Sequence, residues 1–229
     1  MAKHNVTPQE NALGEAVDKT GSFFEENSKT IVWALVAIFV IAGAIYGYRK
    51  FVAEPRIEKA AEMIAEAQYR FEAENADFEL ALNGDQNGAG FLEVIDRYGS
   101  TPSGNLAKHY AGICYLRLGD LEAAADYLSQ YSPVKGLAGQ IINAQNLGLQ
   151  GDIAVEQNDF AKAADLYKKA AAASDNSFTA PLFLRKRGLA LQALGNEAEA
   201  ADTFKSILSD YPASSEAREV EKLIGSTQE

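Results

Sequence analysis

The chain has few of the residues that enzymes use for nucleophilic catalysis or metal binding. Its 229 residues include one cysteine, Cys114, and two histidines, His4 and His109. One cysteine cannot form a disulfide within the chain, so the fold must be stable without one. His109 and Cys114 are five residues apart, which places them about 500° around a helix and on different faces.

No phosphate-binding glycine loop, zinc pattern or nucleophile elbow is present in the sequence. We therefore predict a protein that is not an enzyme and that has no cofactor or metal site. Cys114 is interpreted as a packed core residue, and His109 as a surface or groove residue.

Basic residues are also few. The chain has 21 Lys and Arg against 32 Asp and Glu, a formal net charge of −11. Such a surface repels the phosphates of nucleic acid, and no basic patch with interleaved aromatic residues offsets this. It also opposes spreading over anionic lipid. The charge balance therefore excludes nucleic acid as an expected partner.

One stretch, Ile31 to Tyr48, contains no charged residue. As a helix it would be about 27 Å long, close to the ~30 Å hydrocarbon thickness of a bilayer. Thirty residues precede it and no small-x-small cleavage site follows, so a retained signal-anchor fits better than a cleaved signal peptide or a buried core helix. This predicts an acidic tail over 1–30, a transmembrane anchor over 31–53 and a soluble domain over 55–229.

The tail and the anchor each contain one further pattern. Thr7 to Glu10 has capping-box spacing and Gly21 closes the element, which predicts a short juxtamembrane helix before the membrane helix. It is either a docking element for a partner or a solvated tail. Gly43 and Gly47 form a GxxxG pair that would let another helix approach closely, unless the two small residues occur there by chance.

Pro55 is expected to end the membrane helix, because proline lacks the amide donor. Apolar residues then recur every seven positions, which predicts one long amphipathic helix ending near Asn83 and Gly84. The loop from Asn83 to Gly88 invites a calcium interpretation, but Val94 stands where a bidentate Glu is needed, so a Gly-rich interhelical loop is favoured. The residues of the seven-residue series are Ile57, Ile64, Phe71 and Phe78.

Three blocks after Phe91 repeat at intervals of 39 and 37 residues. In each block a glycine stands seven residues before a turn, an alanine follows the first turn residue by five, and a large residue comes four later. The glycine and alanine would permit close helix packing, and the large residue would fill the space beside them. The blocks are Gly112, Gly119-Asp120, Ala124 and Leu128; Gly151, Asn158-Asp159, Ala163 and Tyr167; and Gly188, Gly195-Asn196, Ala200 and Phe204.

These blocks resemble the tetratricopeptide repeat, a 34-residue helical hairpin with small residues where its two helices cross. A degenerate first unit is visible at Phe91 to Tyr98, with the helix after Pro55 as its partner. The resemblance implies an all-α fold: an N-terminal transmembrane helix, then a tetratricopeptide-repeat-like α-solenoid of about four hairpins, and a capping helix near Ala213 to Leu223.

The whole chain resembles the YfgM family. The resemblance includes the acidic tail with Phe23-Phe24-Glu25-Glu26-Asn27, one anchor, Tyr46 to Arg49 at its exit, and the acidic repeat domain. It implies an ancillary subunit of the bacterial Sec translocon, with a cytoplasmic N-terminus and a periplasmic repeat domain in the inner membrane. Implied partners are the SecYEG channel, a PpiD-like anchored chaperone and translocating polypeptides.

The charges that flank the anchor favour the opposite orientation. Lys19 and Lys29 lie on the N-terminal side of the uncharged stretch 31–48, whereas four basic residues lie on its C-terminal side, so positive-inside counting predicts a cytoplasmic domain. The rule is weak for a following domain of this length, and we side with the orientation that the family implies. The four basic residues are Arg49, Lys50, Arg56 and Lys59.

Binding is the activity that remains. In repeat hairpins the first helices line a concave groove, whose mixed polar and apolar surface would suit extended or partly folded polypeptide. The alternative is that these positions only pack against neighbouring helices. The candidate groove residues are His109, Ile113, Leu116, Gln145, Asp152, Val155, Arg185, Leu189 and Gln192.

Three functions compete at this point. The leading hypothesis is a translocon-associated scaffold that recruits chaperone activity to emerging chains. Its rival is an envelope assembly scaffold unrelated to protein export. A membrane-tethered enzyme that uses Cys114 and His109 is the third.

Overall fold

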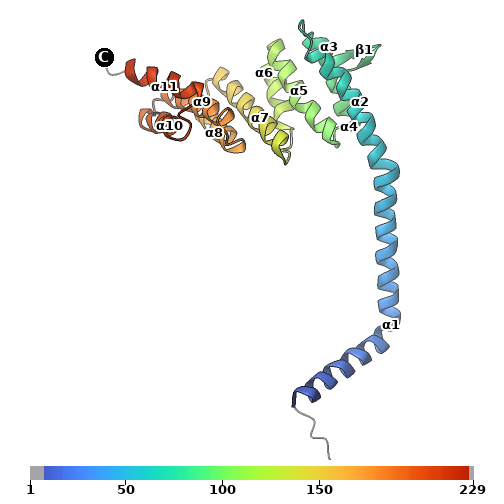
Figure 1. The fold of residues 1–229 in the computed structure, drawn as a ribbon. Coiled ribbons are helices and arrows are strands. Elements are labelled where there is room, and N and C mark those ends of the chain that lie inside the picture. The colour runs from blue at the N-terminus through green and yellow to red at the C-terminus, as the bar shows by residue number, and fades with distance from the viewer. Residues whose placement is uncertain (1–7, 227–229) are drawn as a thin grey trace, which may run out of the picture. The chain divides into compact units, whose positions relative to one another are not determined.

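The computed structural model describes residues 8–226 of the chain, with side chains from 26 to 222. It divides into two compact units, residues 1–55 and 56–229. The first unit contains the long N-terminal helix, and the second contains the repeated helix pairs (Figure 1).

The first unit is helical throughout its described part. Helix α1 spans Pro8–Tyr48, and a π-helical turn, η1, follows over Arg49–Ala53. The uncharged stretch lies within α1 with its large side chains exposed, among them Trp33 and Phe39 at 73% and 74%. Of the described residues, one helix is long and apolar enough to cross a membrane.

The tail does not form a separate juxtamembrane helix. Gly21, which was expected to close such a helix, lies inside α1, and Thr7 lies outside the described residues. A single glycine costs about 1 kcal/mol in a helix interior, about a third of the cost of a proline, so it need not end a helix. A Cβ placed on Gly43 or Gly47 would meet no atom within 4 Å, and packing of another helix at this pair stays a prediction.

Pro55 does not end the helical path as expected. It is the second residue of α2, Glu54–Phe71, in the first helical turn where the missing amide costs little. The Glu54 amide donates to the Arg49 carbonyl, five residues back, in the wide hydrogen-bond pattern of a π-helix. The π-helical turn therefore leads into α2 without a non-helical residue.

The expected long helix after Pro55 is two helices. Helix α2 ends at Phe71, and α3, Phe78–Asn83, begins after Asp77, whose carboxylate accepts from the Leu80 amide at 2.9 Å. The seven-residue series nevertheless identified core residues, because the rings of Phe71 and Phe78 pack edge to face with centroids 5.7 Å apart. Ile64 is buried whereas Ile57 is 41% exposed, so periodicity located the buried face from Ile64 onwards and missed the break between the helices.

The loop after α3 is a small hairpin. Strands β1, Gly84–Asp85, and β2, Gly88–Ala89, pair antiparallel. The Asp85 carboxylate accepts from Arg70 at 2.7 Å and from the Asn87 amide at 2.9 Å. The backbone bond from Asn87, together with nearby Arg70, lowers the pKa of Asp85. Asp85 therefore stabilises the turn of the hairpin and links it to α2 through Arg70.

The rest of the second unit is a series of paired helices that begins with α4, Phe91–Tyr98 (Figure 1). Helix α2 shares a core with α4, because Ile64 and Ala67 cluster with Phe91 and Val94. The later pairs are α5/α6, α7/α8 and α9/α10, and α11 follows. Their bounds are Pro102–Leu118 for α5, Leu121–Ser129 for α6, Leu137–Glu156 for α7, Phe160–Ala173 for α8, Thr179–Ala193 for α9, Glu197–Asp210 for α10 and Ser215–Ser226 for α11.

The three predicted turns form in the same way. Gly119, Asn158 and Gly195 have positive φ angles of 85°, 58° and 83°. In each turn the next residue caps the second helix, because its side-chain oxygen accepts from the amide three residues later. The capping residues are Asp120, Asp159 and Asn196.

The glycines of the three blocks lie where the large residues need space. A Cβ on Gly112 would come within 2.5 Å of Leu128, one on Gly151 within 2.6 Å of Tyr167, and one on Gly188 within 2.3 Å of Phe204. Real Cβ atoms essentially never approach so closely. The predicted pairing of small and large residues across each hairpin is therefore confirmed.

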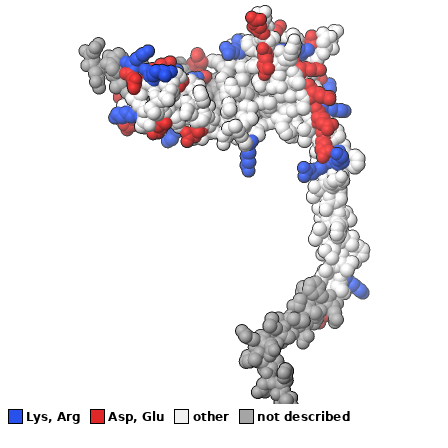
Figure 2. All heavy atoms as spheres, viewed as in Figure 1, with Lys and Arg blue, Asp and Glu red and all other residues white. Residues whose placement is uncertain are grey.

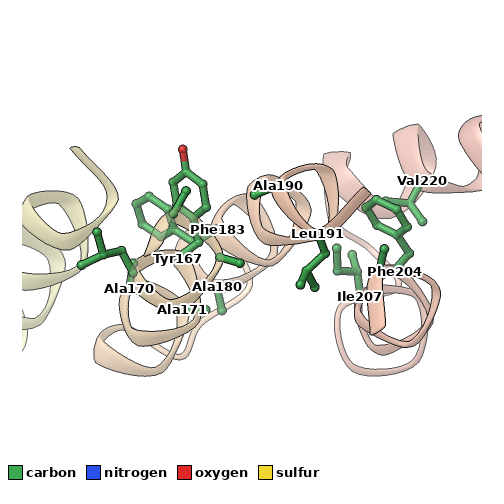
Figure 3. Close-up of a cluster of buried hydrophobic side chains, with 14 of the residues drawn as sticks. Tyr167, Ala170, Ala171, Ala180, Phe183, Ala190, Leu191, Phe204, Ile207 and Val220 are labelled. Carbon is green, nitrogen blue, oxygen red and sulfur yellow. The ribbon is translucent and has the colours of Figure 1, made fainter. Parts of the chain in front are cut away.

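The second half of the solenoid has one continuous core. Side chains from α8, α9, α10 and α11 gather in it, as Figure 3 shows. Ala217 and Val220 of α11 are buried there, so α11 covers the apolar end of the last hairpin. The predicted all-α solenoid of about four hairpins with a terminal helix is confirmed, with α11 starting two residues later than expected.

Candidate functional site

The candidate groove residues lie on the first helices of three hairpins, α5, α7 and α9, as the repeat alignment predicted. The structure brings some of them together around one pocket and places others elsewhere. Gln145 and Gln192 are exposed, while Ile113 and Leu116 are half-buried. Leu116 packs on the cluster of Ala124, Leu128 and Ile153.

His109 is not a groove residue. Only 2% of its surface is exposed, and its Nδ1 accepts from the Asn146 amide at 3.2 Å. Asn146 Oδ1 in turn accepts from Gln150 at 2.7 Å, so the pair is part of a hydrogen-bonded contact between α5 and α7. Burial lowers the pKa of His109 to about 4 and keeps the ring neutral at pH 7. The prediction of a surface or groove histidine was therefore wrong.

Arg185, another candidate groove residue, contacts the terminal helix instead. Its Nε is 3.2 Å from a carboxylate oxygen of Glu219 on α11. The side chain therefore links α9 to the terminal helix, and its charge is compensated by a structural partner.

An apolar pocket of about 240 Å³ opens between α7, α8 and α9. Val155 and Leu189, two of the candidate groove residues, line it. Leu189 is 39% exposed although it is a large aliphatic residue. We refer to this site as the α7–α9 pocket; its lining residues are Val155, Phe160, Tyr167, Lys186, Leu189, Ala190 and Ala193.

A polar network holds one edge of the α7–α9 pocket. Lys186 Nζ lies 2.8 Å from both carboxylate oxygens of Asp152, and the Tyr167 hydroxyl donates to Asp152 at 2.6 Å. The hydroxyl points out of the apolar cluster that buries the ring (Figure 3). Burial of Tyr167, followed by its bond to Asp152, raises the pKa of the phenol. Asp152, a candidate groove residue, thus positions a lysine and a tyrosine from two other helices.

Sequence reasoning missed most of the pocket lining. Phe160, Lys186, Ala190 and Ala193 come together only because α9 packs across α7 and α8, and residues so far apart in sequence leave no local pattern. One signal was present, because Lys186 stands three residues before Leu189 and therefore shares its helix face.

Cys114 and His109 do not form a reactive pair. Cys114 is fully buried in the cluster around Phe91, and burial raises the pKa of its thiol to about 12. A buried neutral thiol is a poor nucleophile. Within the described residues, no three His, Cys, Asp or Glu side chains are grouped in a way that could hold a metal ion.

Charge is unevenly distributed over the solenoid. Acidic side chains form a line along α2 in Figure 2, where Glu58, Glu62 and Glu66 are exposed at four-residue spacing. The middle of the solenoid, over α5 and α7, is largely uncharged in the same view. Partners that contact this region would meet apolar and neutral polar groups.

The fold defines a class of protein, an α-helical repeat solenoid, and repeats of the matched kind suggest a scaffold for protein–protein interaction. Residues 149–215 match the tetratricopeptide repeat family model, and this segment contains the α7–α9 pocket. Among solved structures, one described as the crystal structure of MamA protein is 18% identical, with a TM-score of 0.47, and the match covers 83% of this chain and 90% of that chain. No curated protein matches the chain. Tetratricopeptide-repeat proteins are generally non-enzymatic adaptors, and their repeats imply protein partners.

Proposed function

We propose that this chain is a membrane-anchored, non-enzymatic scaffold that holds polypeptide partners at the α7–α9 pocket. The observation that supports this most is the pocket itself, an open apolar site with a partly exposed Leu189 and a fixed polar edge. An apolar side chain of a partner enters the pocket, and the exposed Gln192 is available to its backbone. Residues 31–53 anchor the scaffold in the bacterial inner membrane.

The partners that we propose are the SecYEG translocon, a PpiD-like anchored chaperone and translocating polypeptides. Support comes from the resemblance to the YfgM family in the tail, the anchor and the repeats. The N-terminus is then cytoplasmic and the repeat domain periplasmic. Four basic residues on the C-terminal side of the uncharged stretch 31–48 favour the reverse orientation, so orientation is a separate test of the proposal.

Filling the pocket tests the binding role. Ala193 lines the pocket and is exposed, so Ala193→Phe occupies the space without replacing a buried residue. Ala201→Phe is the matched control, because Ala201 is exposed on α10 and does not line the pocket. Full-length protein is purified in mild detergent, and co-purified proteins are quantified by mass spectrometry.

We expect the unmodified protein and Ala201→Phe to recover SecYEG subunits and an anchored chaperone, and Ala193→Phe to recover at least tenfold less chaperone. Absence of both partners from the unmodified protein would refute the translocon assignment. Recovery of a different envelope complex, lost in Ala193→Phe, would support the rival assembly scaffold instead. Equal recovery by both variants would remove the pocket from the binding role.

A further inference from the structure

Exposed apolar side chains cluster at the N-terminal end of α7. Val134, Leu137 and Ile141 are 46%, 79% and 50% exposed. A second apolar cavity of about 240 Å³, lined by Leu106, Tyr131, Val134 and Ile142 among others, opens beside them. We call the three exposed residues and this cavity the α7 N-terminal surface.

This surface is separate from the α7–α9 pocket. Ile142 lines one and Val155 lines the other. Thirteen residues of helix separate them, about 20 Å along the axis. A ligand of one site therefore need not occupy the other.

The backbone beside the cavity is already hydrogen-bonded within the chain. Asn105 donates to the Ser132 carbonyl at 2.8 Å and accepts from its amide at 2.8 Å. Asn143 likewise donates to the Val134 carbonyl at 2.9 Å and accepts from the Val134 amide at 3.0 Å. An extended peptide cannot add as a strand along these residues, because their amides and carbonyls are occupied. A helix, which satisfies its own backbone, needs only the apolar side-chain surface.

The charges around the surface indicate the chemistry of its partner. No Asp or Glu occurs between Gly99 and Gly119, or between Gln130 and Gly151, although the chain has 32 of them. Lys135, directly after Val134, is exposed. An apolar surface with an adjacent cation, and with no carboxylate on α5 or on α7 before Asp152, complements an apolar stripe flanked by acidic residues.

We propose that the α7 N-terminal surface docks an amphipathic helix of a partner protein, with acidic residues beside its apolar stripe. One apolar side chain of that helix enters the cavity, and neighbours one turn away pack on Leu137 and Ile141. Three exposed side chains and one cavity fall short of the roughly 800 Å² per partner that a stable dimer interface needs, so a short helix fits better than a second copy of this chain.

The test uses the full-length chain in phosphatidylcholine nanodiscs and three fluorescent peptides. The first is an amphipathic helix with Glu beside its apolar stripe, the second has Lys in place of Glu, and the third has two central prolines that prevent a helix. Anisotropy titrations give their affinities for the unmodified chain. The same titrations are made with Ile141→Asp, with Ala193→Phe and with empty nanodiscs. Leu118→Asp is the matched control for Ile141→Asp, because Leu118 and Ile141 are 48% and 50% exposed.

The proposal predicts that the Glu-flanked helix binds at least tenfold more tightly than either other peptide. Ile141→Asp should weaken it at least tenfold, while Leu118→Asp and Ala193→Phe leave it within twofold. Absent binding, equal binding of the Lys peptide, or preference for the proline peptide would overturn the proposal. Three further results would also overturn it. The first is equal binding of the peptide to empty nanodiscs, and the second is loss of binding in Ala193→Phe but not in Ile141→Asp. The third is a dimer of the chain that Ile141→Asp dissociates.

Discussion

Single residues set the spacing of the helices in three of the hairpins, α5/α6, α7/α8 and α9/α10. Gly112, Gly151 and Gly188 have the only side chain small enough to lie against Leu128, Tyr167 and Phe204. The three contacts share one geometry because the sequence repeats at almost constant intervals. These glycines are therefore packing residues rather than flexible points of the chain.

Gly151→Ala tests this packing. Its Cβ would lie 2.6 Å from Cε1 of the buried Tyr167 ring, so either the ring or α7 must move. We expect a loss of about 1–3 kcal/mol in the free energy of unfolding, typical of overpacking a core. Urea unfolding of the domain, followed by circular dichroism, measures it.

A double-mutant cycle provides the control for that substitution. Gly151→Ala combined with Tyr167→Leu should cost less than the sum of the two single changes, because the smaller side chain leaves space for the added methyl group. Strict additivity would contradict the proposed contact.

His109 makes stability depend on pH. Its pKa is lowered by burial from 6.5 to about 4 in the folded state. Between these values the unfolded chain binds the proton more readily, so the folded state loses stability as pH falls from 6.5 towards 4. The loss over this interval is about 3 kcal/mol.

His109→Gln has no group that titrates in this range. Its free energy of unfolding should therefore depend less on pH between 6.5 and 4 than that of the unmodified chain, by about 3 kcal/mol. Urea unfolding at a series of pH values compares the two proteins. Parallel pH profiles would show that His109 is accessible to protons in the folded state.

At the scale of helices and turns, the second helices of the three repeat blocks, α6, α8 and α10, each start at a side-chain cap. Asp159 accepts from the Lys162 amide at 3.1 Å and directly follows the positive-φ residue Asn158. Asp159→Ala should lower the free energy of unfolding by about 1 kcal/mol. Asp165→Ala, at an exposed position within the same helix, is the control and should change stability by less than about 0.5 kcal/mol.

Local patterns in the sequence predicted local structure well. The turns at Gly119, Asn158 and Gly195 and the small-to-large pairs could be predicted because each depends on residues at most 16 apart that recur three times. The break after Phe71 could not be predicted, because residues before and after it pack into the same core. The continuation of helix through Pro55 depends on a π-helical turn, for which the sequence has no distinct signal.

The candidate site was predictable only in part. Val155, Leu189 and Asp152 were identified because the repeat places first helices on the groove side. His109 was misplaced, because its partner Asn146 lies 37 residues away and no local spacing indicates that contact. The rest of the pocket lining depends on how α9 crosses α7 and α8.

For the whole molecule, we propose a membrane anchor joined to a repeat domain whose largely uncharged middle region is available to partners. In this proposal the domain meets exported polypeptides. The charges after the anchor and the likeness to the YfgM family predict opposite locations for that domain. Measurement of its compartment decides between them.

Thiol labelling provides that measurement. Cys114 is fully buried, so the unmodified chain should not react with a membrane-impermeant maleimide. Phe178, 88% exposed in the loop before α9, is a suitable site for a reactive thiol through Phe178→Cys. Ala2→Cys reports on the tail. The proposed orientation predicts that Phe178→Cys is labelled in intact spheroplasts and Ala2→Cys only after permeabilisation. The reverse pattern would place the domain in the cytoplasm and contradict the proposed role in export.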